Sequence, residues 1–213
     1  MCKDKYIGFF SYDVPVSDIR IHKTAEVSTS ALIDEGVLIW QYVHIRDHVS
    51  IGENSIIGRG VYVGEGVSIG KNCKIQNYAL IYEPAKLEDG VFIGPSVVLT
   101  NDEYPRAITP DGKIKSALDW NPVGVLIKKG ASIGASSVCI APLTIGEWSL
   151  VAAGSTVVNN VPAYALVAGS PAKIINWVGQ EGLPLNKISE YLYECPKSGQ
   201  RYKLLDSETM VIE

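Results

Sequence analysis

The sequence predicts an all-β fold, a parallel β-helix in which short strands wind around one axis. Three observations predict it. Between residues 21 and 99 every sixth residue is aliphatic, and the period returns between residues 127 and 157 with one cysteine among the aliphatic residues. The residue four places after each aliphatic one is mostly small or β-branched, and a glycine often follows the aliphatic residue directly. A fixed period of six matches neither an α-helix nor a single strand, and it is typical of solenoids.

Each hexad is expected to form one short strand and one corner. The aliphatic residue points to the axis, and the residue four places later fills the interior near a corner, where only a compact side chain fits. We expect the glycine after the aliphatic residue to supply the positive φ that a corner needs. Three hexads close one triangular coil, so residues three hexads apart should stack at strand spacing, roughly 4.8 Å. A β-sandwich with coincidental spacing is the alternative, and the many in-register hexads argue against it.

The chain divides into three parts. Residues 1–20 precede the period and are expected to cap the open end of the solenoid, because such an end exposes unpaired backbone. Residues 21–173 form the β-helix. Residues 174–213 form a tail, in which a β-hairpin and a third strand are expected at residues 191–194, 202–205 and 210–212, with a turn at residues 196–199.

One excursion interrupts the period, at residues 100–126. This segment is polar and contains three prolines and a turn signal at Pro110-Asp111-Gly112. Long excursions from a regular scaffold are often functional, although a tolerated decoration is the alternative. The stacking of successive coils puts Glu83 one coil from Asn101, at the corner where the chain leaves the solenoid.

Composition excludes several classes of protein. The chain has 213 residues and 46% hydrophobic residues, enough for one core. The net charge of -4 lacks the basic footprint of nucleic-acid binding, and no apolar run reaches membrane length. The N-terminus, Met1 to Lys5, lacks the apolar segment of a signal peptide. Four scattered cysteines (Cys2, Cys73, Cys139 and Cys195) are expected to be reduced thiols of a cytoplasmic protein.

No nucleotide-binding or metal-binding pattern is evident in the sequence. There is no phosphate-binding P-loop and no strand–GxGxxG–helix unit. Only three histidines occur, and His44 and His48 lie in successive hexads and therefore on different faces. A catalytic metal needs several converging ligands, so none is expected.

Three runs carry a more specific resemblance: Gln76-Asn77, Leu87 to Ser96 (LEDGVFIGPS) and Thr100 to Arg106 (TNDEYPR). Together they resemble the nucleotide-sugar N-acetyltransferases of the hexapeptide-repeat, left-handed β-helix acyltransferase superfamily. That group acts on dTDP- or UDP-linked 3-amino sugars in surface-polysaccharide and O-antigen biosynthesis. Further matches are an early motif with Trp40 and His44, and the tail residues Cys195 to Gly199 and Tyr202. The resemblance implies a left-handed coil, a homotrimer, and acetyl-CoA as co-substrate in the groove between subunits.

The resemblance also implies a site for the amino sugar under the excursion. The residue matching Asn101 contacts the sugar amine in that group. Asp102 is adjacent to it and Glu83 stacks one coil away, so these three are the catalytic candidates. Solvation on an exposed face is the alternative for Glu83, which departs from the group's usual non-acidic residue. The candidates for sugar-nucleotide binding are Gln76, Asn77, Tyr104, Arg106 and His44.

Some of these residues have an assigned contact and a structural alternative. Arg106 is expected to pair with the diphosphate, and Tyr104 is expected to border the sugar. An ion pair that fixes the loop is the alternative for Arg106, and packing within the loop is the alternative for Tyr104. For Gln76 and Asn77, the alternative is that their side chains simply line the outside of a coil.

The coenzyme side rests on two runs of small residues. The first is Ala152, Ala153 and Gly154, and the second contains Gly169, Ser170 and Lys173. Both resemble the superfamily's cofactor wall, where small side chains let pantetheine approach the backbone. Lys173 is expected to neutralise a CoA phosphate, with surface solvation as its alternative.

The general base is the open question. Many enzymes of the superfamily use a loop histidine, but no histidine follows His48 in this chain. Either a carboxylate is the base, or positioning of a neutral amine suffices and the released thiolate takes the proton. The alternatives for function are a serine-type or other small-amine acetyltransferase, a metal-dependent hydratase resembling γ-class carbonic anhydrase, and a non-catalytic scaffold.

Overall fold

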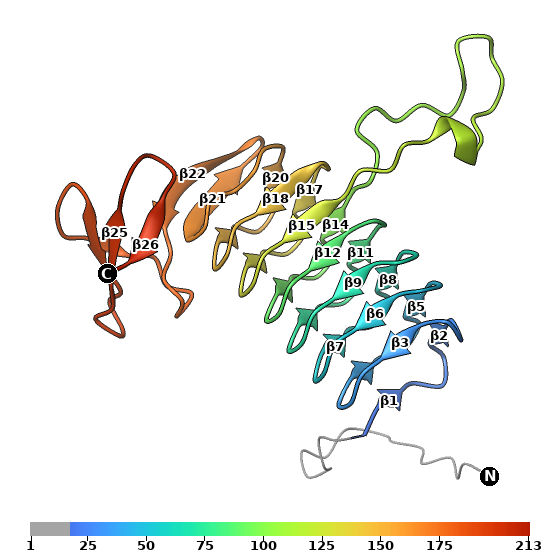
Figure 1. Ribbon diagram of the computed structural model, residues 1–213, viewed down its shortest axis with the longest axis horizontal. Coiled ribbons are helices and arrows are strands. Elements are labelled where there is room, and N and C mark those ends of the chain that lie inside the picture. Colours follow the sequence, from blue (N-terminus) through green and yellow to red (C-terminus); the bar gives the residue numbers. More distant parts are fainter. Residues whose placement is uncertain (1–17) are drawn as a thin grey trace.

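A computed structural model describes residues 18–213 of the protein (Figure 1). Short strands stack into a straight solenoid from β2 to β21, one long excursion projects from its side, and a small sheet lies at the C-terminal end. The expected N-terminal cap, residues 1–20, falls almost entirely outside the described residues. The all-β, parallel β-helix fold predicted from the period of six is confirmed.

Three parallel sheets form the sides of the solenoid. The first sheet contains, in order, β1 (Arg20–Ile21), β4 (Leu38–Ile39), β7 (Ile56–Ile57), β10 (Lys74–Ile75), β13 (Phe92–Ile93), β16 (Ser132–Ile133), β19 (Leu150–Val151), β21 (Ala165–Gly169) and the antiparallel β22 (Ala172–Trp177). The second contains β2 (Glu26–Val27), β5 (His44–Ile45), β8 (Tyr62–Val63), β11 (Leu80–Ile81), β14 (Val98–Leu99), β17 (Val138–Cys139) and β20 (Thr156–Val157). The third contains β3 (Leu32–Ile33), β6 (Ser50–Ile51), β9 (Ser68–Ile69), β12 (Lys86–Leu87), β15 (Val125–Ile127) and β18 (Leu143–Ile145).

The register follows the predicted coil of three hexads. Leu80 pairs with Val98 and Ile81 with Leu99, so each residue stacks on the one three hexads further along the chain. Across the excursion Lys86 pairs with Leu126, and this one coil is therefore more than twice as long as the others. The chain returns to the solenoid with β15, whose first residue precedes the expected boundary at residue 126.

The core consists of the two inward positions predicted for each hexad. Val63 and Val67 are both fully buried, and Ile69 is 2% exposed. The first coil is the exception, since the side chain of Ile21 is 47% exposed. Coils further along the axis are covered on both sides, and their interior is a stack of aliphatic side chains with Cys73 and Cys139 among them.

The glycines that follow the aliphatic residue do not supply the positive φ expected of them. Positive φ occurs two residues later, at Gly60 (φ 66°) and Asn72 (φ 56°), for example. Gly58 is needed for a different reason. A Cβ at Gly58 would lie 2.8 Å from the backbone nitrogen of Asn77 on the next coil. The expectation was wrong because close stacking of coils, rather than backbone torsion, excludes a side chain there.

The tail forms the expected hairpin and third strand, and one strand more. The four-stranded antiparallel sheet consists of β23 (Asn186–Lys187), β24 (Leu192–Glu194), β25 (Arg201–Leu204) and β26 (Met210–Ile212). Tyr202 anchors this sheet to the last coil, since its ring lies 5.5 Å from that of Tyr164 and its hydroxyl accepts a hydrogen bond from the Gln180 backbone nitrogen.

The cysteines of the described chain agree with the expectation from composition. Cys73, Cys139 and Cys195 are free thiols, as predicted. Burial raises the pKa of Cys139 to about 12, which makes this thiol unreactive.

In the described part of the chain, the helical structure is one 3-10 helix at Ala117–Asp119. Among residues 18–213, no helix is long and apolar enough to cross a membrane.

Candidate functional site

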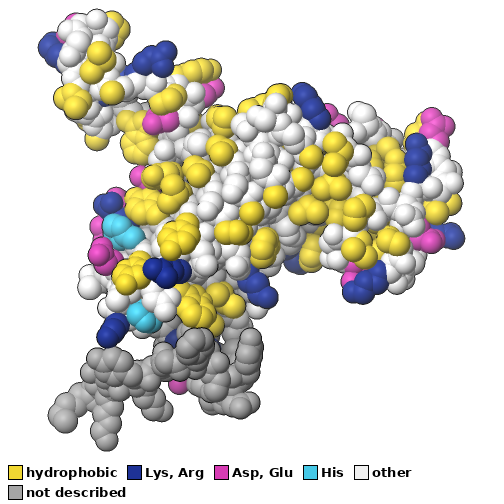
Figure 2. All heavy atoms as spheres, turned by 180° about the vertical axis from the view of Figure 1, so that it is seen from behind, with side chains coloured by type: hydrophobic (Ala, Val, Ile, Leu, Met, Phe, Trp, Pro, Cys, Tyr) yellow, Lys and Arg dark blue, Asp and Glu magenta, His cyan; other side chains and the backbone are white. Residues whose placement is uncertain are grey.

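The excursion is an arm that is closed at its base and turned at its tip. At the base, the carbonyl of Asn101 accepts a hydrogen bond from the nitrogen of Val123 at 3.1 Å. At the tip, Ile108 pairs with Ile114 around the predicted Pro110–Gly112 turn, and Gly112 has a φ of 84°. A short 3-10 helix (Ala117–Asp119) is capped by Ser116 on the returning limb. Figure 2 shows hydrophobic side chains on this arm beside charged ones.

A hollow of about 370 Å³ opens on the arm near its base. It brings together three of the predicted residues, Asp102, Tyr104 and Arg106, with Lys115 and Trp120. Tyr104 is 79% exposed, and Arg106 donates a hydrogen bond of 2.9 Å to the carbonyl of its neighbour Pro105. Within the described chain, Arg106 therefore forms no ion pair that would fix the loop. Its guanidinium remains available for an anion.

Asp102 has a partner inside the arm. Its Oδ1 accepts a hydrogen bond of 2.7 Å from the Trp120 indole nitrogen. The side chain therefore connects the outgoing and returning limbs, a role that the sequence pattern did not indicate. The hydrogen bond that positions Asp102 also reduces its freedom to move toward a substrate.

Glu83 lies at the corner below the arm, as the stacking arithmetic predicts. Because Ile81 pairs with Leu99, the residue stacked on Glu83 is Asn101. The neighbouring Pro84 contacts Gly124, which returns from the arm. Gly124 therefore takes the stacked position above Pro84 that Asp102 would occupy in an uninterrupted solenoid. This displacement follows from the excursion, which leaves the solenoid after Asn101 and re-enters before β15.

The Glu83 carboxylate is buried at one oxygen. Oε2 is inaccessible to solvent and has no hydrogen-bond partner among residues 18–213. It lies over Gly64, one coil lower, where a Cβ would be only 2.0 Å from it. A buried acceptor without a donor is uncommon in folded proteins, so this corner differs from a solvated surface position.

An aromatic row covers the second sheet beside this corner. The rings of His44 and Tyr62 are 5.6 Å apart in an edge contact, and those of Tyr62 and Tyr82 are 5.2 Å apart. Burial, followed by the charge of Glu83, raises the pKa of Tyr62. The row therefore continues from His44 to the corner that bears Glu83.

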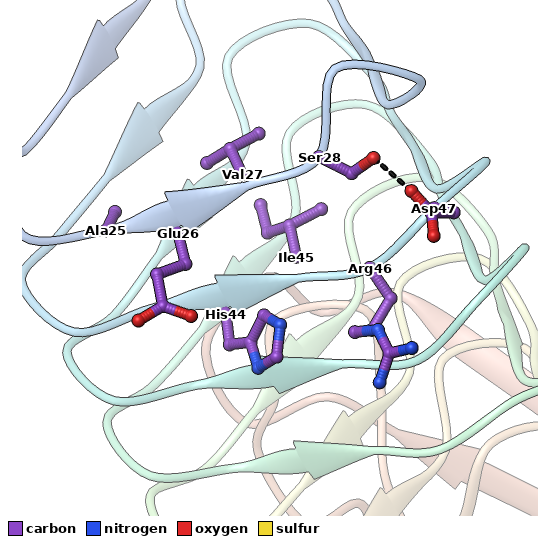
Figure 3. A pocket seen from close by; sticks show the side chains of 8 residues that line it. All are labelled: Ala25, Glu26, Val27, Ser28, His44, Ile45, Arg46 and Asp47. Carbon is purple, nitrogen blue, oxygen red and sulfur yellow. Dashed lines mark hydrogen bonds between the residues drawn. The ribbon is translucent and has the colours of Figure 1, made fainter.

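A second hollow of about 510 Å³ lies at the start of this row, against β2 and β5 (Figure 3). Glu26, His44 and Arg46 project from one side of the two strands, whereas Val27 and Ile45 project from the other. Hydrogen bonds from two serines, Ser28 and Ser30, lower the pKa of Asp47 at its edge. His44 is thus surface-accessible, but it lies coils away from Asn101 along the solenoid.

The other sugar-side candidates, Gln76 and Asn77, lie on a different edge, between the first and second sheets. They follow β10, whereas Glu83 and Asn101 follow β11 and β14 at the edge between the second and third sheets. The amide oxygen of Asn77 accepts a hydrogen bond of 2.9 Å from the Arg59 nitrogen. Asp89 makes the same corner bond to Lys71, so this contact of Asn77 is part of a recurring structural device.

The coenzyme-side candidates share the edge of Gln76 and Asn77. Ala152, Ala153 and Gly154 follow β19, and a Cβ at Gly154 would meet nothing within 4 Å. Gly169 ends β21 and Ser170 follows it in the turn to β22, and the hydroxyls of Ser170 and Thr156 are 3.0 Å apart. Lys173 is exposed beside them. This open, small-residue edge fits a narrow chain such as pantetheine running along it.

Within a single chain, the two halves of the predicted site therefore lie apart. The amine-side residues lie on one edge of the triangular solenoid and the coenzyme-side residues lie on another, with the second sheet between them. The sequence pattern did not single out Tyr62, Tyr82 or Trp120, and it marked Gly64 only as one of the glycines that follow an aliphatic residue. The stacking of residues three hexads apart does predict that Gly64 lies below Tyr82. The contacts of Glu83 and Trp120 instead join residues that are not stacked on each other, and the period of six does not predict such contacts.

A metal centre finds no support in the described chain. Among residues 18–213, no three histidine, cysteine or acidic side chains gather as ligands. The expectation that the reaction needs no metal stays a prediction.

Comparisons with known proteins agree with the repeat. Residues 30–65 and 66–101 each match the family model of the bacterial transferase hexapeptide, six repeats. Residues 30–101 thus resemble the hexapeptide repeats of bacterial transferases. The acetyltransferase domain of PglB from Neisseria gonorrhoeae has the same fold, with a TM-score of 0.52 and 21% identity over 74% of this chain and 58% of that one.

Two curated relatives of this hexapeptide-repeat chain match over part of their length. One is the dTDP-3-amino-3,6-dideoxy-alpha-D-galactopyranose 3-N-acetyltransferase of Aneurinibacillus thermoaerophilus, 45% identical over 82 residues, which are 38% of this chain and 41% of that protein. The other is the serine acetyltransferase of Haemophilus influenzae, 32% identical over 88 residues, 41% of this chain and 32% of that protein. The matches thus span less than half of either relative.

Proposed function

We propose that this protein is an N-acetyltransferase that moves the acetyl group of acetyl-CoA to the amino group of a nucleotide-linked amino sugar. A dTDP- or UDP-linked 3-amino-deoxyhexose is the preferred acceptor. Both relatives described above are acetyltransferases by name, and one acts on a dTDP-linked 3-amino sugar. We place the activity in the cytoplasm, in the synthesis of surface polysaccharide such as O-antigen.

The observation that carries the proposal is the arrangement at the base of the arm. Asn101 and the Glu83 carboxylate, which is buried at one oxygen, lie at one corner, and the hollow with Asp102, Tyr104 and Arg106 opens beside them. This combination offers an amide and a carboxylate for an amine, an aromatic side chain for the sugar ring and a guanidinium for a diphosphate. A non-catalytic scaffold would have no need of an unsatisfied carboxylate at this place.

The division of the site between two edges supports a homotrimer. In such an assembly the edge with Ala152 to Gly154 of one subunit faces the arm of its neighbour, so acetyl-CoA and the sugar meet between subunits. Acetyl-CoA supplies the thioester whose acyl carbon forms the new C–N bond while the C–S bond breaks. Asn101 orients the amine, and proximity provides much of the rate enhancement.

No side-chain base is required in this proposal. The amine reacts in its neutral form, and the proton that it loses is taken up by the departing thiolate. Turnover should therefore rise with pH as the substrate ammonium deprotonates. The second relative suggests a serine-type activity as the alternative. Many enzymes of the superfamily use a loop histidine as the base, and this chain has no histidine after His48.

The test is a screen of acceptors with acetyl-CoA, followed by thiol release. The acceptors compared are serine and the 3-amino and 4-amino sugars linked to dTDP or UDP. The purified protein is also analysed for bound metal by mass spectrometry. We expect acetylation of at least one amino sugar nucleotide, and Asn101→Ala should reduce its turnover severely with an unchanged melting temperature. Acetylation of serine alone, or near-normal turnover of Asn101→Ala with every amino sugar, would contradict the proposal.

A further inference from the structure

The hollow on the arm has one apolar corner, formed by Trp120 and Val123 on the returning limb. Of the described residues that line the hollow, Val123 is the only aliphatic one. Most of the others are charged, namely Asp102, Glu103, Arg106, Lys115 and Asp119. A pocket that combines apolar surface with a few polar groups is suited to a small ligand that carries both kinds of substituent.

Both residues of the apolar corner are held in place. The indole nitrogen of Trp120 donates its hydrogen bond of 2.7 Å to Asp102, and 37% of the Trp120 surface remains exposed. Val123 is half-buried and packs against the core of the solenoid. Its backbone nitrogen donates a hydrogen bond of 3.1 Å to the carbonyl of Asn101. The corner is therefore fixed at its edges and still accessible from the hollow.

The bond between Val123 and Asn101 places the apolar corner beside the residue that orients the acceptor amine in the proposed function. In a 3-amino-6-deoxyhexose the one purely apolar substituent is the methyl group of carbon 6, which is attached two ring positions from the amine-bearing carbon. Burial of a methyl group against apolar side chains is favourable. A hydroxyl group in the same place would lose water without gaining a hydrogen-bond partner.

We propose that Trp120 and Val123 are specificity-determining residues, and that their apolar corner receives the carbon-6 methyl group of the acceptor. The inference rests on the proposed function and narrows its substrate class, because the enzyme then selects 6-deoxy amino sugars over the same sugars with a hydroxyl at carbon 6. Neither residue takes part in acyl transfer. Their contribution is to the choice of acceptor.

The direct test compares two acceptors that differ only at carbon 6, dTDP-3-amino-3,6-dideoxygalactose and dTDP-3-amino-3-deoxygalactose. We expect the kcat/KM of the wild type to favour the 6-deoxy acceptor about tenfold, the lower end of the range for one small group in a hydrophobic pocket. Val123→Thr keeps the shape of the side chain and adds a hydroxyl that can bond to the 6-hydroxyl group. The ratio of the two kcat/KM values should therefore fall to about one. A folded Val123→Thr with the wild-type ratio would overturn the inference.

Three further variants separate the corner from general damage. Val211→Thr makes the same exchange at a half-buried valine of the tail and should keep the wild-type ratio. Trp120→Phe keeps an aromatic ring in the corner, so KM should rise for both acceptors while their ratio is preserved. Val123→Ala removes the contact without adding a polar group and should lower the ratio in part. It replaces Val123→Thr if thermal melting shows that variant to be unfolded, and an unchanged ratio in Val123→Ala would then contradict the proposal.

Failure of the proposed function gives a different result. If the wild type acetylates neither acceptor, that function is wrong, and the corner is then tested by calorimetric binding of dTDP-6-deoxygalactose and dTDP-galactose, which carry no amine. We expect the wild type to bind the 6-deoxy compound more tightly and Val123→Thr to bind both alike. Equal binding of the two compounds to the wild type, or binding of neither, would overturn the inference as well.

Discussion

The carboxylate of Asp102 accepts a hydrogen bond of 2.7 Å from the indole nitrogen of Trp120, across the base of the excursion. Together with the backbone bond between Asn101 and Val123, it joins the two limbs of the arm. We therefore interpret Asp102 as a residue that positions the arm rather than as the general base.

Trp120→Phe should raise KM for the amino sugar severalfold and change kcat little. The substitution keeps a ring in the hollow and removes only the hydrogen bond, which is exposed, so its loss should cost about 1 kcal/mol. Asp102→Asn should be milder, because its amide oxygen still accepts the bond. Steady-state kinetics at several pH values checks both variants. A loss of more than about a thousandfold in kcat for Asp102→Asn, with loss of the alkaline rise, would show instead that Asp102 is the base.

Val67→Asp should abolish the soluble, folded protein. Val67 is fully buried in the axis, and an unpaired charge there costs several kcal/mol. Ser68→Asp is the matched control, since Ser68 is the outward residue of β9 and pairs across the coil with Lys86. Soluble yield and circular dichroism compare the two. A folded Val67→Asp protein would mean that the inward register is wrong.

Gly58→Ala should lower the free energy of unfolding by about 1–3 kcal/mol, the usual cost of overpacking. Its Cβ would meet the backbone of Asn77, which cannot move aside as a flexible side chain can. Gly66→Asn should be nearly neutral, because Gly66 has a φ of 66° with open space around it, and asparagine occupies equivalent corners at Asn54 and Asn72. Urea unfolding measures both, and equal effects would refute the close-approach explanation.

Glu88→Gln should destabilise the protein by less than about 1 kcal/mol at pH 7, since the pair with Lys128 at 2.8 Å is partly exposed. The hydrogen bond from Lys128 is the largest cause that lowers the pKa of Glu88 below its ordinary 4.5. A lowered pKa means that this stabilisation is present above pH 4.5 and is lost as the pH falls through the folded-state pKa. Urea unfolding of both proteins at pH 7 and near pH 3 should therefore show the difference disappear. A constant difference would exclude the ion pair as its source.

The period of six was sufficient to predict most of the solenoid. It assigned inward positions such as Val67, the register between coils and the place of Glu83 one coil from Asn101, because the same local pattern recurs in every coil. The turn signals of the tail were equally local, and β24 and β25 formed where they were expected. The reason for glycine at position 58 was predicted wrongly, since the contact that requires it comes from the next coil.

The sequence by itself determined the fold class, the excursion and the residue types available for chemistry, since each follows from composition or from spacing along the chain. Only the tertiary structure decided how those residues are grouped. It engaged Asp102 with Trp120 and enclosed the Glu83 oxygen over Gly64. The physical reason is that side-chain direction and the path of an irregular arm depend on contacts between coils, and a one-dimensional period does not encode these contacts.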